Sequence, residues 1–128
     1  MKIEKDYKYT KNHEWVAQED GQARIGISDY AQEELGELVF VDFDATPDEF
    51  SVGDEIVLLE SSKAVASVYA PIDGELVEIN EELEDIPEKI NEDCFGEGWL
   101  VSLKLKDASQ LDKLMTADQY KEYVDSLE

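Results

Sequence analysis

The feature that most constrains the fold is a pair of β-type segments separated by a short stretch of small, polar residues. Residues 56–59 are all apolar, residues 65–69 are rich in β-branched and small side chains, and Lys63 lies in the stretch between them. Two β-rich runs joined by a few polar residues are typical of a β-hairpin. The sequence therefore predicts that Lys63 lies at a hairpin tip, between neighbours too small to shield its side chain.

The charges around Lys63 make it unusual. The sequence has no other lysine or arginine between Arg24 and Lys89, whereas residues 25–88 contain 19 acidic residues. Nearby opposite charge favours the charged form of an amine, so we expect Lys63 to stay protonated and to be a poor spontaneous nucleophile. It is well presented to an enzyme that must modify a single lysine. The alternative, an ordinary exposed turn lysine, is favoured by spacing alone.

Composition narrows the class of protein. A chain of 128 residues, 42% of them hydrophobic, is expected to form one domain with its own core rather than a disordered acidic tail. The net charge of -22 argues against binding to nucleic acid or to an anionic membrane, both of which need a basic protein surface. The same charge would steer a partner with a basic docking face toward the protein.

Candidate sites other than Lys63 are weak. Cys94 is the only cysteine, which excludes an internal disulfide and a cysteine-based zinc site, and we expect it to be a buried, inert thiol. His13 is the only histidine, and nothing around it or Cys94 indicates a catalytic pair. The acidic residues 81–85 lack the ligand spacing and the glycine of an EF-hand loop, so they predict a solvated face and no metal site.

Targeting signals are not evident in the sequence. No apolar stretch approaches the length of a membrane span, and residues 1–6 contain no apolar signal core. These observations predict a cytoplasmic protein.

The first half of the chain predicts strands joined by tight turns. The dipeptide Asp20-Gly21 between residues 14–19 and 22–27 is a strong hairpin signal, because both positions tolerate positive φ. Ser28 can cap a short helix over residues 29–35 that stops at Gly36. Further on, the patterns predict a strand at 38–43, a loop at 46–49 and a turn at 51–54.

The second half adds strands and ends in helices. A turn at 71–74 precedes a strand at 75–79, and residues 80–87 form a polar segment with Leu83 and Ile86 directed inward. Residues 99–106 alternate apolar and polar side chains, which is typical of a half-buried antiparallel strand. A short helix is expected at 110–115. Thr116 and Gln119 form a capping box, and a final helix packs Tyr120, Tyr123, Val124 and Leu127 on the sheet.

Taken together, these elements predict a small β-sandwich or barrel with peripheral helices, and no spacing of residues indicates a catalytic site. A resemblance is carried by residues 9–11 with 13–16, 26–33, 35–41, 60–64, 69–71, and 91–93 with 96–99. In these segments, in their order and in their spacing, the sequence resembles the H proteins of the glycine cleavage system. The combination is far more specific than any single segment.

The resemblance implies a mainly all-β fold. This is a lipoyl-domain-like barrel-sandwich hybrid of two small antiparallel sheets, with short peripheral helices and a C-terminal helix. A single domain would span residues 1–128, with a core at about 14–106 and a C-terminal helical segment at about 107–128. The resemblance also implies that Lys63 carries lipoic acid in amide linkage.

Roles for further residues are implied by the same resemblance. Glu60, Gly53 and Gly74 correspond to positions that the lipoylating enzyme recognises, the two glycines by shaping the flanking turns. Glu14 and Ser67 correspond to a cleft that holds the loaded arm, and a carboxylate at Glu14 would pair with its ammonium group. The family usually has Asp at the position of Ser67, Val at that of Ser62 and Pro at that of Cys94. The Ser67 difference removes a charge near the cleft.

The function implied is that of a non-catalytic shuttle with four partners. A pyridoxal-phosphate glycine decarboxylase loads an aminomethyl group, a tetrahydrofolate-dependent aminomethyltransferase removes it, a dihydrolipoamide dehydrogenase takes the electrons, and a separate enzyme attaches lipoic acid. Two alternatives remain open at this point. One is a lipoyl donor for 2-oxo acid dehydrogenase complexes, and the other is an unmodified acidic interaction module. A biotin carrier is disfavoured because Ser62 and Ala64, not methionines, flank Lys63.

Overall fold

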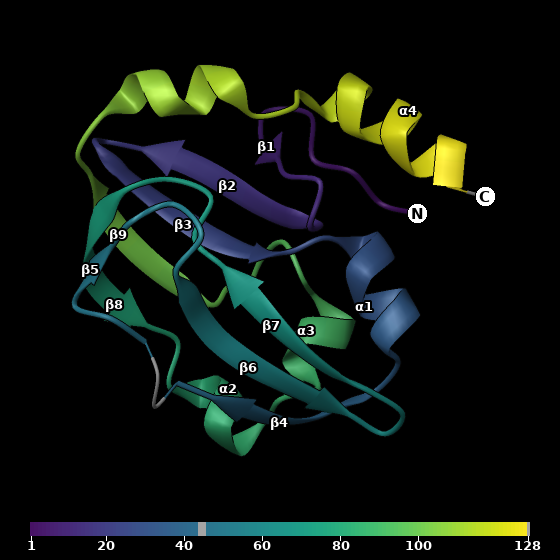
Figure 1. Ribbon diagram of the computed structural model, residues 1–128. Helices are drawn as coiled ribbons and strands as arrows, with labels where there is room; N and C mark the ends of the chain where they lie inside the picture. Colours follow the sequence, from purple (N-terminus) through teal and green to yellow (C-terminus); the bar gives the residue numbers. More distant parts are fainter. Residues whose placement is uncertain (44–45, 128) are drawn as a thin grey trace.

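The computed structural model describes residues 1–43 and 46–127 and shows two packed antiparallel sheets (Figure 1). One sheet has the strand order β1-β2-β3-β9-β8-β5 and the other has the order β4-β6-β7. The strands are β1 (Lys8–Tyr9), β2 (Glu14–Glu19), β3 (Gln22–Ile27), β4 (Leu38–Asp42), β5 (Glu49–Phe50), β6 (Glu55–Ser61), β7 (Val65–Tyr69), β8 (Gly74–Ile79) and β9 (Val101–Leu105). This arrangement confirms the predicted fold class.

Short helices surround the sheets, and the longest one ends the chain. They are α1 (Asp29–Leu35), α2 (Glu82–Asp85), α3 (Lys89–Glu92), the 3₁₀ helix η1 (Ala108–Lys113) and α4 (Ala117–Leu127). No helix in the described part of the chain is long and apolar enough to cross a membrane. Residues 44, 45 and 128 lie outside the described residues, so the last residue of the predicted C-terminal segment is not placed.

Local signals in the sequence place several elements correctly. The β2–β3 hairpin turns at Asp20 and Gly21, whose φ angles are 52° and 78°, as the Asp-Gly signal predicts. The Ser28 hydroxyl accepts a hydrogen bond from the Ala31 amide and caps α1, which ends at Gly36 with a φ of 82°. At the other end of the chain, the Thr116 amide donates to Gln119 Oε1 and the Gln119 amide donates to Thr116 Oγ1, so the capping box is confirmed.

Other expectations from the sequence are wrong. Ile86 is 40% exposed, because it follows the four-residue helix α2, from which Leu83 alone is buried in the core. Leu127 is 48% exposed at the end of α4, which extends past the sheets in Figure 1. Residue 49 belongs to β5 and pairs with Glu75 instead of lying in a loop. The predicted helix at 110–115 is the 3₁₀ helix η1 at 108–113, and α2 and α3 were not predicted.

Trp15 is 1% exposed and centres an aromatic part of the core with the rings of Tyr7 and Phe95. Its indole ring lies against Gly26, where an added Cβ would come within 2.5 Å of the ring, so only glycine fits at this position in β3. The indole N–H donates to the Cys94 carbonyl over 3.0 Å. Cys94 itself is buried, and burial raises the pKa of its thiol to about 12. The predicted burial of the thiol is confirmed, and the raised pKa agrees with the expectation that it is inert.

Helix α4 is tied to the rest of the fold by Tyr120. The ring of Tyr120 is fully buried and stacks on Tyr9, with 4.5 Å between ring centroids. Its hydroxyl lies 2.8 Å from His13 Nδ1 and 2.6 Å from Ser28 Oγ. Because Ser28 also caps α1, one phenol group connects α4, the residue before β2 and the start of α1.

We predict that Tyr120→Phe lowers the free energy of unfolding by about 1–3 kcal/mol, because it keeps the stacked ring but removes the hydroxyl that bonds to part-buried His13 Nδ1 and to buried Ser28 Oγ. Denaturant unfolding measures the change. Tyr123→Phe is the matched control, since the Tyr123 hydroxyl makes only an exposed bond of 3.4 Å to the Lys11 carbonyl. Equal effects of the two variants would show that the phenol network does not stabilise the fold.

Candidate functional site

The tip of the β6–β7 hairpin presents Lys63, as the sequence predicts. The Ser61 amide donates to the Ala64 carbonyl over 2.8 Å and closes the turn. The Ser61 hydroxyl oxygen accepts from the amides of Lys63 and Ala64, at 3.2 and 3.0 Å. Lys63 is exposed between its small neighbours. A single serine side chain therefore holds the backbone of the lysine in a defined turn while the amine projects into solvent.

The tip rests on the connection between α1 and β4. The Ser62 amide donates to the Glu37 carbonyl over 3.0 Å. The methylene groups of Lys63 lie over Gly36, where an added Cβ would come 3.1 Å from Lys63 Cε. In Figure 1 the β6–β7 tip and α1 lie on the same side of the molecule. The salt bridges among the described residues involve Lys89 and Lys106, so the Lys63 amine is held by no carboxylate within that part of the chain.

The three residues expected to guide lipoylation lie at opposite ends of the hairpin. Glu60 is close to the tip, at the end of β6, opposite Val65 of β7. Gly53 and Gly74 lie at the far end, before β6 and at the start of β8. Gly53 has a φ of 93°, and a Cβ at Gly74 would overlap the Leu103 side chain at 1.8 Å. Both glycines are therefore required by the local backbone, whether or not an enzyme recognises them.

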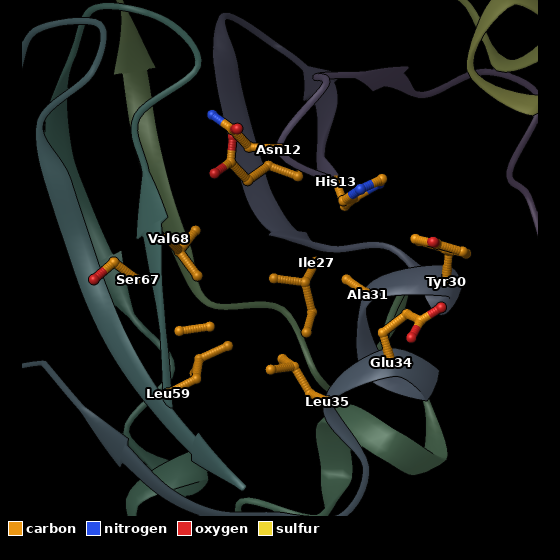
Figure 2. A pocket seen from close by; sticks show the side chains of 12 residues that line it. Asn12, His13, Ile27, Tyr30, Ala31, Glu34, Leu35, Leu59, Ser67 and Val68 are labelled. Atoms are coloured by element: carbon orange, nitrogen blue, oxygen red, sulfur yellow. The ribbon is translucent and has the colours of Figure 1, made fainter. Parts of the chain in front are cut away.

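A pocket of about 400 Å³ opens between α1, the start of β2 and the β6–β7 hairpin (Figure 2). Its lining is largely apolar, with polar side chains at Asn12, His13, Glu14, Glu34 and Ser67. The other lining residues are Ile27, Tyr30, Ala31, Leu35, Leu59, Ala66 and Val68. Ala66, on β7, is three residues from Lys63, and Leu35, which also lines the pocket, precedes Gly36, over which the Lys63 chain lies. A flexible group attached to Lys63 can therefore reach this pocket.

Glu14 places a buried carboxylate in the pocket and joins the two sheets. Its side chain belongs to β2 of the larger sheet and is 2% exposed. One carboxylate oxygen accepts from the Thr10 hydroxyl at 2.8 Å, and the other accepts from the amide of Tyr69, in β7, at 2.9 Å. Burial raises the pKa of Glu14 above its ordinary value of 4.5, although both hydrogen bonds act in the opposite direction. The carboxylate is therefore placed to attract a cation.

Ser67 lines the pocket but directs its hydroxyl elsewhere. The hydroxyl donates to Glu55 Oε1 over 2.8 Å, and Figure 2 shows it pointing away from the other labelled side chains. The structure thus brings Glu14 and Ser67 to the same pocket, as the resemblance implies, with only the carboxylate of Glu14 buried there.

His13 and Tyr30 line the pocket, a role that residue patterns in the sequence did not indicate for either residue. Their rings lie 4.7 Å apart, and burial lowers the pKa of His13, which favours the neutral imidazole. A neutral ring does not repel a cation at Glu14. The one sequence signal that could have placed His13 at the pocket is its position directly before Glu14. Among the described residues, no group of three or more His, Cys, Asp or Glu side chains is arranged to hold a metal ion.

Comparisons of the sequence and of the structure with known proteins all identify the same family. A family model described as glycine cleavage H-protein matches residues 7–127. Glycine cleavage system H proteins from Staphylococcus epidermidis and Coprothermobacter proteolyticus are 48% and 46% identical, each over 97% of this chain and 98% of the relative. A crystal structure of a glycine cleavage system H protein from Mycobacterium marinum superimposes with a TM-score of 0.83 and 36% identity, covering 94% of this chain and 98% of that one. The chain therefore belongs to the glycine cleavage H-protein family.

Proposed function

We propose that lipoic acid is attached in amide linkage to Lys63, and that the chain works as the non-catalytic carrier of the glycine cleavage system. As a member of this family, the chain is a lipoyl-carrying shuttle. The observation that supports Lys63 as the attachment site is its presentation at a closed hairpin tip, three residues before Ala66 of the pocket lining. It is also the only lysine or arginine between residues 25 and 88.

The pocket suits such an arm. Acylation removes the charge of the Lys63 amine, so that its chain and the attached hydrocarbon can lie on an apolar surface. Ile27, Leu35 and Val68 offer that surface, and Glu14 offers a charge beyond it. When attached, the lipoyl group would supply a disulfide that opens to take an aminomethyl group on one sulfur, and the dithiol left after that group is removed would give up two electrons to close the disulfide again. Tethering keeps the carried group at a high effective concentration near each enzyme.

Three enzymes would share this arm, and a fourth would attach it. They are the pyridoxal-phosphate glycine decarboxylase, the tetrahydrofolate-dependent aminomethyltransferase, the dihydrolipoamide dehydrogenase and a lipoyl-attaching enzyme. The cytoplasmic location expected from the sequence stays a prediction. The recognition of Glu60, Gly53 and Gly74 by the attaching enzyme is also part of this proposal.

Glu14 gives the carrier a means to protect its cargo. An aminomethyl group is cationic, and water cleaves it to formaldehyde and ammonium. The Glu14 carboxylate would pair with the ammonium inside the pocket, where few water molecules reach it. The Thr10 hydroxyl, which donates to one carboxylate oxygen, and the Tyr69 amide, which donates to the other, would hold the carboxylate in place. A pure lipoyl donor has no need of a buried carboxylate here, so Glu14 favours the glycine cleavage role.

We predict that Lys63→Arg abolishes glycine decarboxylation in the reconstituted system, because a guanidinium stays protonated and cannot be acylated. Carbon dioxide release from labelled glycine measures the activity, and circular dichroism checks that the variant is folded. Lys104→Arg, on the exposed side of β9, is the control and should keep full activity. Wild-type activity in Lys63→Arg would disprove the proposed attachment site.

We also predict that Glu14→Gln accelerates formaldehyde release from the loaded protein by about tenfold or more, because the amide cannot pair with the ammonium. Glu33→Gln, an exposed change on α1, should release formaldehyde at the wild-type rate. The difference between Glu14→Gln and wild type should shrink as the pH falls below the raised pKa of Glu14, since a protonated carboxyl group loses its charge. A wild-type rate for Glu14→Gln at neutral pH would remove Glu14 from this role.

A further inference from the structure

The outer face of the three-stranded sheet carries an exposed apolar row beside the Lys63 tip. In the β4-β6-β7 sheet, Phe40 pairs with Glu60, and Glu60 pairs with Val65. Directly paired residues in antiparallel strands project from the same face of the sheet. Phe40 is 45% exposed and Val65 is 63% exposed. The two apolar side chains therefore flank Glu60 on one solvent-facing surface. Val65 is two residues from Lys63.

This surface is rimmed by acidic residues. Glu60 lies within the row, and Glu37, which precedes β4 and accepts from the Ser62 amide of the tip, is exposed. The only basic residue between positions 25 and 88 is Lys63 itself. A partner that covers the row must bury apolar area against Phe40 and Val65, and it must offer basic side chains to the rim.

We propose that the row formed by Phe40, Glu60 and Val65 is the docking surface for the enzyme that acylates Lys63. The proposal rests on the carrier function and adds the contact chemistry of one partner: an apolar strip bordered by lysine or arginine. Glu60 then acts within a larger surface, in which Phe40 and Val65 supply the apolar contact and Glu60 supplies the charge between them.

The reach of the lysine favours this enzyme over the enzymes that use the loaded arm. Before acylation, the reacting atom is Lys63 Nζ, whose chain lies over Gly36 at the tip. The acylating enzyme must bring this atom into its own active site, so its surface has to meet the strands directly beside the tip. After acylation, the reactive sulfur atoms lie at the end of a long flexible arm, and an enzyme can reach them without touching Phe40 or Val65.

The test measures lipoylation of purified apo protein by a lipoyl-attaching enzyme, with intact mass as the readout. The double variant Phe40→Thr/Val65→Thr places threonine, a β-branched residue that favours strands, at both positions and removes most of the apolar contact. We expect its KM to rise about tenfold or more, with kcat unchanged, because docking weakens while the chemistry is untouched. The wild-type KM should also rise with salt concentration, since basic groups meet the acidic rim.

Val77→Thr is the matched control, because Val77 is 51% exposed on β8 of the other sheet. It should be lipoylated with the wild-type KM, and denaturant unfolding should show that all variants are folded. A wild-type KM for the double variant would overturn the docking surface. So would a double variant that, after full lipoylation, is also used more slowly by dihydrolipoamide dehydrogenase. Failure of the wild type to become lipoylated would instead overturn the proposed carrier function.

Discussion

The buried carboxylate of Glu14 is the interaction on which the fold and the site both depend. A charge removed from water costs several kcal/mol unless hydrogen bonds compensate for it. Here the Thr10 hydroxyl and the Tyr69 amide bind the two oxygens, and the second bond connects the larger sheet to the smaller one. Each bond to a charged group is worth about 1.5–3 kcal/mol. The pKa of Glu14 is nevertheless raised, so burial outweighs these bonds. A buried carboxylate of this kind is the feature on which the proposed binding of a cationic group rests.

The hairpin tip combines a fixed backbone with a free amine. Ser61 holds the turn, Ser62 bonds to the Glu37 carbonyl, and Gly36 leaves room for the Lys63 chain. An enzyme that acylates one lysine needs such a defined approach, because ordering a mobile loop would cost binding free energy. The same tip stands close to the pocket along β7. The molecule thus combines an exposed Lys63 with a pocket nearby, which is the arrangement that the proposed carrier role requires.

Much of the fold was predictable because its signals are local. The Asp20-Gly21 turn, the Ser28 cap and the capping box at Thr116 each depend on a few adjacent residues, and the structure confirms them. The position of Lys63 at a hairpin tip was predictable in the same way, from the two β-type segments on either side of it. Exposure was harder to predict. Ile86 and Leu127 are apolar, and the sequence predicts that they face the core. Both are exposed, because Ile86 follows a four-residue helix and Leu127 lies at the end of α4.

The pocket itself depends on contacts between distant parts of the chain. The bond between His13 and Tyr120 spans 107 positions, and the bond between Glu14 and Tyr69 spans 55. No periodicity or motif in the sequence indicates such pairings, so residue patterns alone would predict that Glu14 is an exposed acid on a strand surface. Family resemblance pointed to Glu14 and Ser67, but it did not reveal that the Ser67 hydroxyl bonds to Glu55.

The most direct test of the account is the intact mass of the protein purified from cells supplied with lipoate, compared with its Lys63→Ala variant. The account predicts one lipoyl increment on the wild type and none on the variant. Wild-type protein without the increment, in cells with an active lipoyl-attaching enzyme, would contradict the assignment of Lys63 as a carrier residue. An increment on both proteins would contradict it as well, because a different residue would then carry the group.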